Sequence, residues 1–69
     1  MTEFDIETIL AFAENNMNIV KAAKKMYVHR NTIVYRIDKI RKETGLNAKS
    51  FYDLVKLVKM VEEGSMENG

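Results

Sequence analysis

The sequence has no cysteine, a single histidine and no long apolar run among its 69 residues. Without cysteine there is no disulfide framework and no thiolate site, which fits a reducing compartment. No segment approaches the roughly 20 apolar residues that a membrane-spanning helix needs. The acidic opening, residues 1–5, lacks the basic and apolar regions of a signal peptide. We therefore expect a soluble, cytoplasmic protein with no membrane partner.

The residues that catalysis needs are equally scarce. His29 has no carboxylate, nucleophile or metal ligand at a suitable spacing, and the sequence shows no glycine-rich phosphate loop. Glu62 and Glu63 are the one carboxylate pair, and we expect them at a solvated helix end. Met17 and Met26 lie on apolar stripes, where methionine is more often a core residue than a ligand. We predict that the chain is not an enzyme and binds no cofactor or metal.

Apolar side chains recur at helical spacing in four segments. This pattern predicts an all-α, four-helix domain with helices at about 5–15, 19–26, 30–43 and 51–63. A chain of this size buries only about 60% of the surface that its unfolded form exposes, so a partner subunit would help its stability. We place the domain at residues 1–63 and expect residues 64–69 to form a disordered tail, because they have little to bury.

Local signals mark where the helices begin and end. Thr2 and Asp5 form a capping-box pattern at the first helix, although Asp5 could itself be the N-cap residue. Ser50 and Asp53 repeat the pattern at the last helix. Gly45 supplies a stop after the third helix, because glycine adopts the left-handed C′ conformation at little cost.

Apolar stripes predict which side of each outer helix is buried. The expected inward residues of the first helix are Ile6, Ile9, Leu10 and Ala13. Those of the last helix are Phe51, Leu54, Val55, Val58 and Val61. Phe12, Leu57 and Met60 fall outside these stripes, so we expect them at the domain edge or against a partner.

The two middle helices share one apolar seam. Asn18 is a good N-cap residue for the first of them. The five-residue steps from Ala23 to Val28 to Ile33 match the small residue, the turn hydrophobe and the first inward residue of a helix-turn-helix. Tyr27 would complete the turn with Val28. The spacing predicts that the longer helix is the recognition helix of such a motif.

Basic residues concentrate on these two helices. Residues 18–49 hold nine basic and two acidic side chains, whereas residues 1–17 hold four acidic and no basic ones, within a net charge of +1. Lysines on a helix face are often merely solvated. A concentrated basic surface, however, releases counterions from a phosphate backbone. Together with the two-helix spacing, the charge pattern favours a polyanion as the partner.

A family resemblance is carried by residues 28–33 (Val-His-Arg-Asn-Thr-Ile), 35–37 (Tyr-Arg-Ile) and 44–46 (Thr-Gly-Leu). They resemble the C-terminal DNA-binding domain of PucR-type bacterial transcription regulators, the class that includes sugar-diacid regulators. The likeness covers about residues 6–61 and extends more distantly to the factor for inversion stimulation. Members usually carry a basic residue where this chain has Val34. The resemblance implies a homeodomain-like fold, binding of double-stranded DNA, and a sensory domain in the full-length regulator.

Helix-turn-helix geometry and the resemblance together predict the DNA-binding residues. The opening turns of a recognition helix, here about residues 30–42, enter the major groove deepest. The residues expected near base edges are Arg30, Asn31 and Thr32. The residues expected to cap a helix or to bind the DNA backbone are Asn18, Lys21, Lys24, Lys25, His29, Tyr35, Arg36 and Lys39. Because one such helix reads only a few base pairs, we expect a homodimer on a two-fold site.

Two other interpretations remain open at this point. A protein-interaction or dimerisation module could retain the helix-turn-helix shape, and outward-facing Phe12, Leu57 and Met60 would support it. RNA binding is the less favoured of the two interpretations, because proteins that read single-stranded RNA usually offer several stacking aromatic side chains. Tyr35 could be an ordinary surface tyrosine, and the resemblance is what favours its contact with a phosphate, a sugar or a thymine methyl group.

Overall fold

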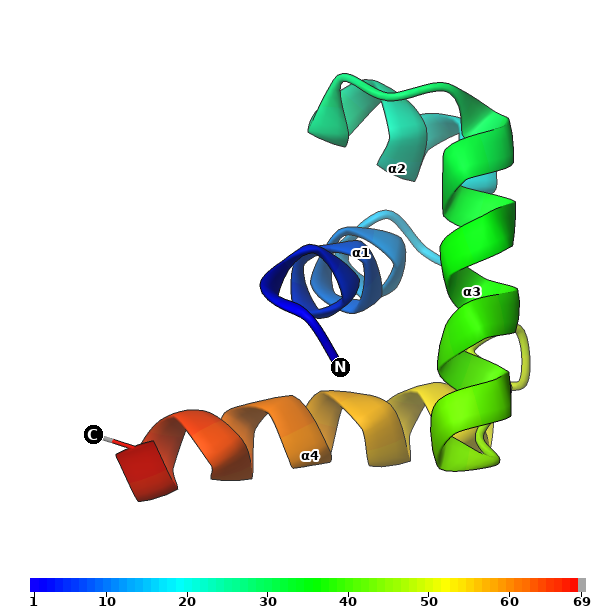
Figure 1. Ribbon diagram of the computed structural model, residues 1–69. Coiled ribbons are helices and arrows are strands. Elements are labelled where there is room, and N and C mark those ends of the chain that lie inside the picture. Colours follow the sequence, from blue (N-terminus) through cyan, green and yellow to red (C-terminus); the bar gives the residue numbers. More distant parts are fainter. Residues whose placement is uncertain (69) are drawn as a thin grey trace.

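The computed structural model describes residues 1–68, except for the side chains of residues 65–68. It contains four α-helices: α1 (Glu3–Glu14), α2 (Ile19–Met26), α3 (Arg30–Thr44) and α4 (Phe51–Asn68) (Figure 1). The all-α fold class is confirmed. Among the described helices, none is long and apolar enough to cross a membrane. α4 continues past the expected end at residue 63, and Gly69, the last residue of the expected tail, lies outside the described residues.

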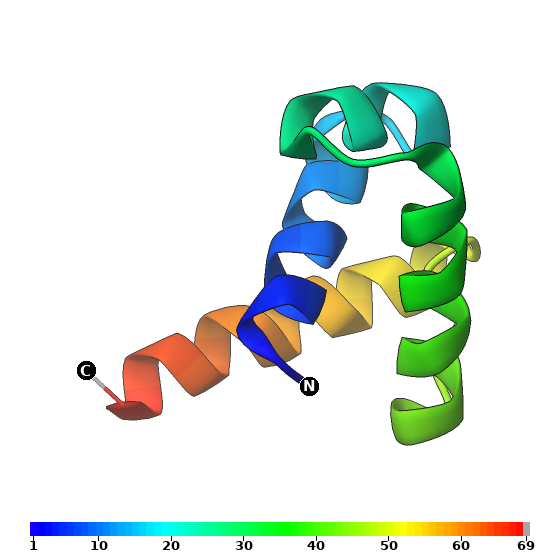
Figure 2. The same cartoon turned by 45° about the horizontal axis from the view of Figure 1, so that its top comes forward.

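The first helix, α1, occupies the centre of the arrangement. Figure 1 shows α1 end-on, with α2 above it, α3 beside it and α4 below it. The turned view in Figure 2 shows the same order, with α1 running between α2 and α4. α1 packs against each of the other helices, whereas the backbones of α3 and α4 do not approach closely within the described chain. The helix-turn-helix pair and the last helix are therefore joined mainly through α1.

One hydrophobic core receives side chains from all four helices. Its largest fully buried apolar residues are Phe12, Ile9, Ile33, Ile40 and Leu57. Full burial of side chains of this size stabilises a fold by about 1.5–3 kcal/mol each relative to their exposure. α2 contributes Ala22 and Ala23, whose small side chains let its neighbours cross closely.

Two expectations about outward-facing residues are wrong. Phe12 is 2% exposed and Leu57 is 0% exposed, so both belong to the core. Met60, at 43% exposed, does face outward as expected. Two of the three side chains that would have supported an interaction module are thus inside the domain.

The predicted inward stripe of α4 is only partly right. Leu54 and Val61 are buried and Val58 packs against the core, as expected, but Phe51 and Val55 are 63% and 39% exposed and Leu57 takes a place in the core. Nearly every position from 51 to 61 that is not charged is apolar, so two stripes of helical spacing exist in this segment. Packing against α1 selects one of them, and that choice is not visible in the local sequence.

Hydrogen bonds at the helix ends confirm two of the expected signals. The Asp5 N–H donates to Thr2 Oγ1 at 3.1 Å and the Thr2 N–H donates to Asp5 Oδ2 at 3.0 Å. Thr2 is therefore the N-cap residue, and the capping box is present. Gly45 ends α3 with φ of +79°, a left-handed conformation that glycine adopts without a Cβ clash.

The start of α4 differs from the expected capping box. The Asp53 carboxylate accepts a hydrogen bond from the Asn47 N–H at 3.0 Å, and the Ser50 N–H donates to the Asn47 carbonyl at 2.9 Å. Asp53 therefore ties α4 back to the preceding loop instead of pairing with the Ser50 N–H. In the same loop Ala48 is buried and Leu46 packs against the core.

Candidate nucleic-acid interface

A tight turn over residues 27–29 joins α2 to α3. Tyr27 ends α2 in the left-handed conformation, at φ 58° and ψ 41°, with its side chain 95% exposed. The Val28 N–H donates to the Ala23 carbonyl at 3.0 Å, and Val28 packs against the core. The expected turn at Tyr27 and Val28 is confirmed. A non-glycine residue in this conformation costs about 1 kcal/mol, because its Cβ crowds the following carbonyl.

A polar side chain caps the start of each helix of the pair. Asn18 Oδ1 accepts from the Lys21 N–H at 3.0 Å, and His29 Nδ1 accepts from the Asn31 N–H at 3.0 Å. Both caps were expected. An imidazole that accepts at Nδ1 carries its proton on Nε2 when neutral, so His29 keeps one N–H donor for an external acceptor. The other free N–H groups at each helix start also favour an anion.

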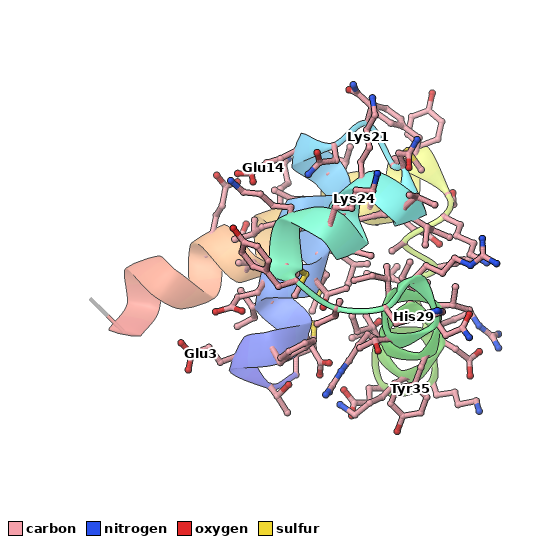
Figure 3. All side chains as sticks on the ribbon, turned by 90° about the horizontal axis from the view of Figure 1, so that it is seen from above. Glu3, Glu14, Lys21, Lys24, His29 and Tyr35 are labelled. Carbon is pink, nitrogen blue, oxygen red and sulfur yellow. The ribbon has the colours of Figure 1, made fainter. Side chains whose placement is uncertain are left out.

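Most of the predicted site residues lie on the surface of α2 and the first half of α3. Figure 3 shows Lys21 and Lys24 on α2 and His29 at the near end of α3. Glu3 and Glu14 lie on the side of α1 away from α3. The predicted site residues that are exposed are Asn18, Lys21, Lys24, Lys25, His29, Arg30, Asn31 and Tyr35, and Thr32 is half-buried. Glu7 and Glu14 line a groove together with Lys25 at the end of α2, so one edge of the basic surface adjoins acidic side chains.

The outer side of α3 carries a shallow groove. It is lined by Asn31, Val34, Tyr35, Ile37, Asp38 and Arg41 of α3 and by Asn47 and Lys49 of the following loop. Tyr35 is 63% exposed and Val34 is 40% exposed. Lys49 is a basic neighbour of this surface that sequence reasoning did not include. No helical spacing relates a loop lysine to α3, because its place depends on how the loop folds back.

Arg36 and Lys39 occupy a different environment from the other predicted site residues. Lys39 Nζ lies 2.8 Å from Asp5 Oδ2, and Arg36 Nη1 lies 3.3 Å from Asp5 Oδ1. The Asp5 side chain is fully buried, and those of Arg36 and Lys39 are 26% and 27% exposed. The Arg36 guanidinium also lies 4.4 Å above the Phe4 ring. α1 therefore supplies an internal partner for two cations of α3.

These contacts determine the charge state of Asp5. Burial by itself raises the pKa of its carboxyl group, but hydrogen bonds from Lys39 and Thr2 outweigh burial and hold the pKa at about 2, below the ordinary 3.8. The hydrogen bond to Asp5 is also the main reason why the pKa of Lys39 is raised. Asp5 is thus ionised at neutral pH and neutralises part of the charge of α3 from within.

A second acidic residue acts on the exposed side of α3. The Asp38 carboxylate lies 3.0 Å from Lys42 Nζ and 3.1 Å from Arg41 Nη2. Hydrogen bonds from Lys42 and Arg41 lower the pKa of Asp38. Because these groups are exposed, water and salt screen the pairs. Among the described residues, Lys21, Lys24 and Lys25 of α2, Arg30 of α3 and Lys49 of the following loop make no ion pair with a carboxylate.

Two capped helices joined by a tight turn, crossing on small residues and basic on their outer sides, define a helix-turn-helix domain. The family model of the PucR C-terminal helix-turn-helix domain matches residues 6–60. The chain belongs to this family, whose domains occur in DNA-binding transcription regulators. The predicted resemblance is thereby confirmed.

Relatives with curated names are similar over the same region. The chain is 47% identical over 45 residues to the uncharacterized protein YxkF of Bacillus subtilis (strain 168), a match that covers 65% of this chain and 15% of that protein. It is 36% identical over 44 residues to the purine catabolism regulatory protein of Bacillus subtilis (strain 168), covering 64% of this chain and 8% of that protein. It is 35% identical over 46 residues to the carbohydrate diacid regulator of Escherichia coli (strain K12), covering 67% and 12%. The chain spans only a small part of each relative, and no solved structure matches it.

Proposed function

We propose that this chain binds double-stranded DNA sequence-specifically, as the DNA-binding domain of a bacterial transcription regulator, with α3 in the major groove. The observation that carries the proposal is the arrangement of α2 and α3. The N-terminal half of α3 presents exposed polar side chains, and α2 places Lys21, Lys24 and Lys25 beside it. An α-helix fits into the major groove, and cations on the neighbouring helix then lie close to the DNA phosphates that flank this groove.

The side chains at the start of α3 have the chemistry for reading bases. Arg30 can present its guanidinium fork to O6 and N7 of guanine, and Asn31 can bond N6 and N7 of adenine. Thr32 is half-buried beside them and offers a hydroxyl. Val34, exposed on the outer side of α3, offers a branched apolar side chain that suits a thymine methyl group.

Another group of side chains suits the DNA backbone. Lysines on α2 provide mobile point charges, and the caps at Asn18 and His29 leave backbone N–H groups at two helix starts. Tyr35, exposed one turn into α3, can donate its hydroxyl to a phosphate. We assign phosphate or sugar contacts to Asn18, Lys21, Lys24, Lys25, His29 and Tyr35.

We also propose that two copies bind one two-fold DNA site and that the full-length regulator includes a sensory domain. One recognition helix covers only a few base pairs, and pairing two half-sites about one helical turn apart supplies the missing specificity. The small share of each relative that the chain covers supports the second part. The burial of Phe12 and Leu57 counts against the alternative of an interaction module.

A salt titration tests DNA binding as such. Each phosphate that the protein neutralises steepens the plot of log K against log salt concentration by about 0.9. We expect a steep loss of affinity for duplex DNA between about 50 and 200 mM salt. An affinity that is the same at both concentrations would contradict the proposal and would favour an interaction module.

Variants of Arg30 and Lys24 distinguish base reading from backbone binding, because the proposed geometry gives these two positively charged residues different roles. On a site obtained by selection from random duplexes, Arg30→Ala should cost about 1–3 kcal/mol and flatten the preference at one base position. Lys24→Ala should weaken selected and scrambled duplexes alike and lower the salt slope by about one unit. If Arg30→Ala weakens both duplexes equally, Arg30 is a phosphate contact and another residue of α3 reads the base.

A further inference from the structure

We infer that Asp5 is a positioning residue for DNA binding: it holds Arg36 and Lys39 against α1 and so removes two cations of α3 from contact with DNA phosphates. The inference rests on the proposed function, because it concerns how many charges of the domain reach the DNA backbone. It also replaces the prediction from the sequence that Arg36 and Lys39 bind DNA phosphates.

The geometry around Asp5 engages both carboxylate oxygens. Oδ1 accepts from Arg36 Nη1 at 3.3 Å, and Oδ2 accepts from Lys39 Nζ at 2.8 Å and from the Thr2 N–H at 3.0 Å. With its side chain fully buried, Asp5 has no access to solvent cations. The two cations of α3 are therefore its counter-charges, and they are held at the surface of α1.

Each of the two cations has a second partner as well. The Arg36 guanidinium lies over the Phe4 ring at 4.4 Å, and its Nε is buried without a hydrogen bond among the described residues. Lys39 Nζ lies 3.2 Å from the Glu43 carboxylate. If Arg36 or Lys39 swung away to a phosphate, the buried Asp5 carboxylate would lose a partner that water cannot replace. Removing a partner from a buried charge costs more than an exposed ion pair gains.

The helical phase of α3 points the same way. Successive residues are separated by about 100° around a helix. Arg36 therefore lies about 100° from Tyr35, whereas Lys39, four residues after Tyr35, lies only about 40° from it. The side chains of both cations turn toward Asp5 of α1, while Asn31, Val34 and Tyr35 line the groove on the outer side. Helical phase thus separates Arg36 from the outer surface, and the ion pair with Asp5 holds Lys39 at its edge.

The consequence is a bias in where the domain attracts DNA. Asp5 and Glu43 together neutralise Arg36 and Lys39. Within the described part of the chain, the cations of α2 and of the start of α3 make no ion pair with a carboxylate, and they lie next to the residues proposed to read bases. The pairing of Arg36 and Lys39 with acidic residues weakens non-specific DNA binding, which depends on charge alone. The DNA contacts at the start of α3 are unaffected. A buried carboxylate far from the DNA thus raises the ratio of specific to non-specific binding.

Two matched lysine variants test the inference on a selected site and on a scrambled duplex. Lys24 is exposed on α2, and Lys39 is paired with Asp5. Lys24→Gln should lower the salt slope by about 0.9, and Lys39→Gln should change it by less than about 0.3. An equal decrease in both variants would overturn the inference but leave DNA binding intact. If the unaltered chain shows no salt-dependent binding, the proposed function itself fails.

The reciprocal variant is Asp5→Asn, with Glu7→Gln as its control. Both remove one negative charge from α1, but Glu7 is exposed and makes no ion pair with any residue that the structure describes. Freeing Arg36 and Lys39 should steepen the salt slope by up to about 1.8, which makes the loss of affinity from 50 to 200 mM salt up to about 12-fold larger. Glu7→Gln should leave the slope unchanged.

Asp5→Asn also removes part of the capping box, so its helical content is checked by circular dichroism before the titration. A folded Asp5→Asn variant with an unchanged or shallower slope would overturn the inference. If this variant does not fold, the comparison of Lys24→Gln with Lys39→Gln decides the question alone.

Discussion

Acid should destabilise this domain through Asp5 in particular. Its folded-state pKa of about 2 lies below the ordinary 3.8 because hydrogen bonds from Lys39 and Thr2 outweigh the effect of burial. A group whose pKa is lowered on folding contributes stability above the unfolded-state pKa and loses it as the pH falls toward the folded-state pKa. The contribution of Asp5 should therefore be complete above about pH 4 and disappear as the pH falls to about 2.

The size of this contribution follows from the shift. At about 1.4 kcal/mol per pKa unit, a decrease from 3.8 to about 2 corresponds to at most about 2.5 kcal/mol of unfolding free energy. Water screens the pair because the Arg36 and Lys39 side chains are 26% and 27% exposed. We therefore expect about 1–2 kcal/mol, which is a large share of the stability of a domain this small.

The measurement is the unfolding free energy as a function of pH for the unaltered chain and for Asp5→Asn. The pKa of Asp38 is also lowered, but Asp38 titrates in both proteins, so the difference between the two curves isolates Asp5. That difference should be constant above about pH 4 and shrink below it. A difference that stays constant from pH 5 to about pH 2 would show that the carboxylate charge contributes nothing, and the assigned pairing with Lys39 would be refuted.

Two further variants test the packing and the turn. Leu57→Ala should lower the unfolding free energy by about 2–5 kcal/mol, because Leu57 is 0% exposed. Met60 is 43% exposed, so Met60→Ala should change the unfolding free energy by less than about 1 kcal/mol. Equal effects of the two variants in denaturant unfolding would mean that the buried face of α4 is wrongly assigned. Tyr27→Gly should increase the unfolding free energy by up to about 1 kcal/mol and so raise the melting temperature, because Tyr27 is 95% exposed and has a left-handed backbone conformation. A lower melting temperature would mean that the Tyr27 ring makes a contact that stabilises the fold by more than the relieved backbone strain.

The sequence was informative where the decisive interactions are local. The caps at Thr2, Asn18 and His29 each involve hydrogen bonds to residues two or three positions away. The left-handed conformation at Gly45 is likewise a property of one residue type. Helix bounds and the turn at Tyr27 follow from such short-range rules. This is why the sequence alone predicts the helix-turn-helix and its outward basic residues.

The features that sequence reasoning missed depend on distant packing. Asp5 is 31 residues from Arg36 and 34 residues from Lys39, and no periodic pattern relates residues at such distances. Its role as a cap was visible, while its second role as a buried counter-charge was not. The face of α4 was wrong at Phe51, Val55 and Leu57, because the segment offers two apolar stripes and only the surface of α1 distinguishes Leu57 from Val55.

The central position of α1 has a consequence for how the domain could respond to a signal. The backbones of α3 and α4 do not approach closely within the described residues, and each packs on α1 (Figure 2). A groove beside α4 is lined by Ala13 near the C-terminal end of α1 and by Met17 just after it, while Asp5 near the N-terminal end of α1 is paired with Lys39 of α3. Any displacement of α1 would therefore be felt at both the α4 groove and the recognition helix.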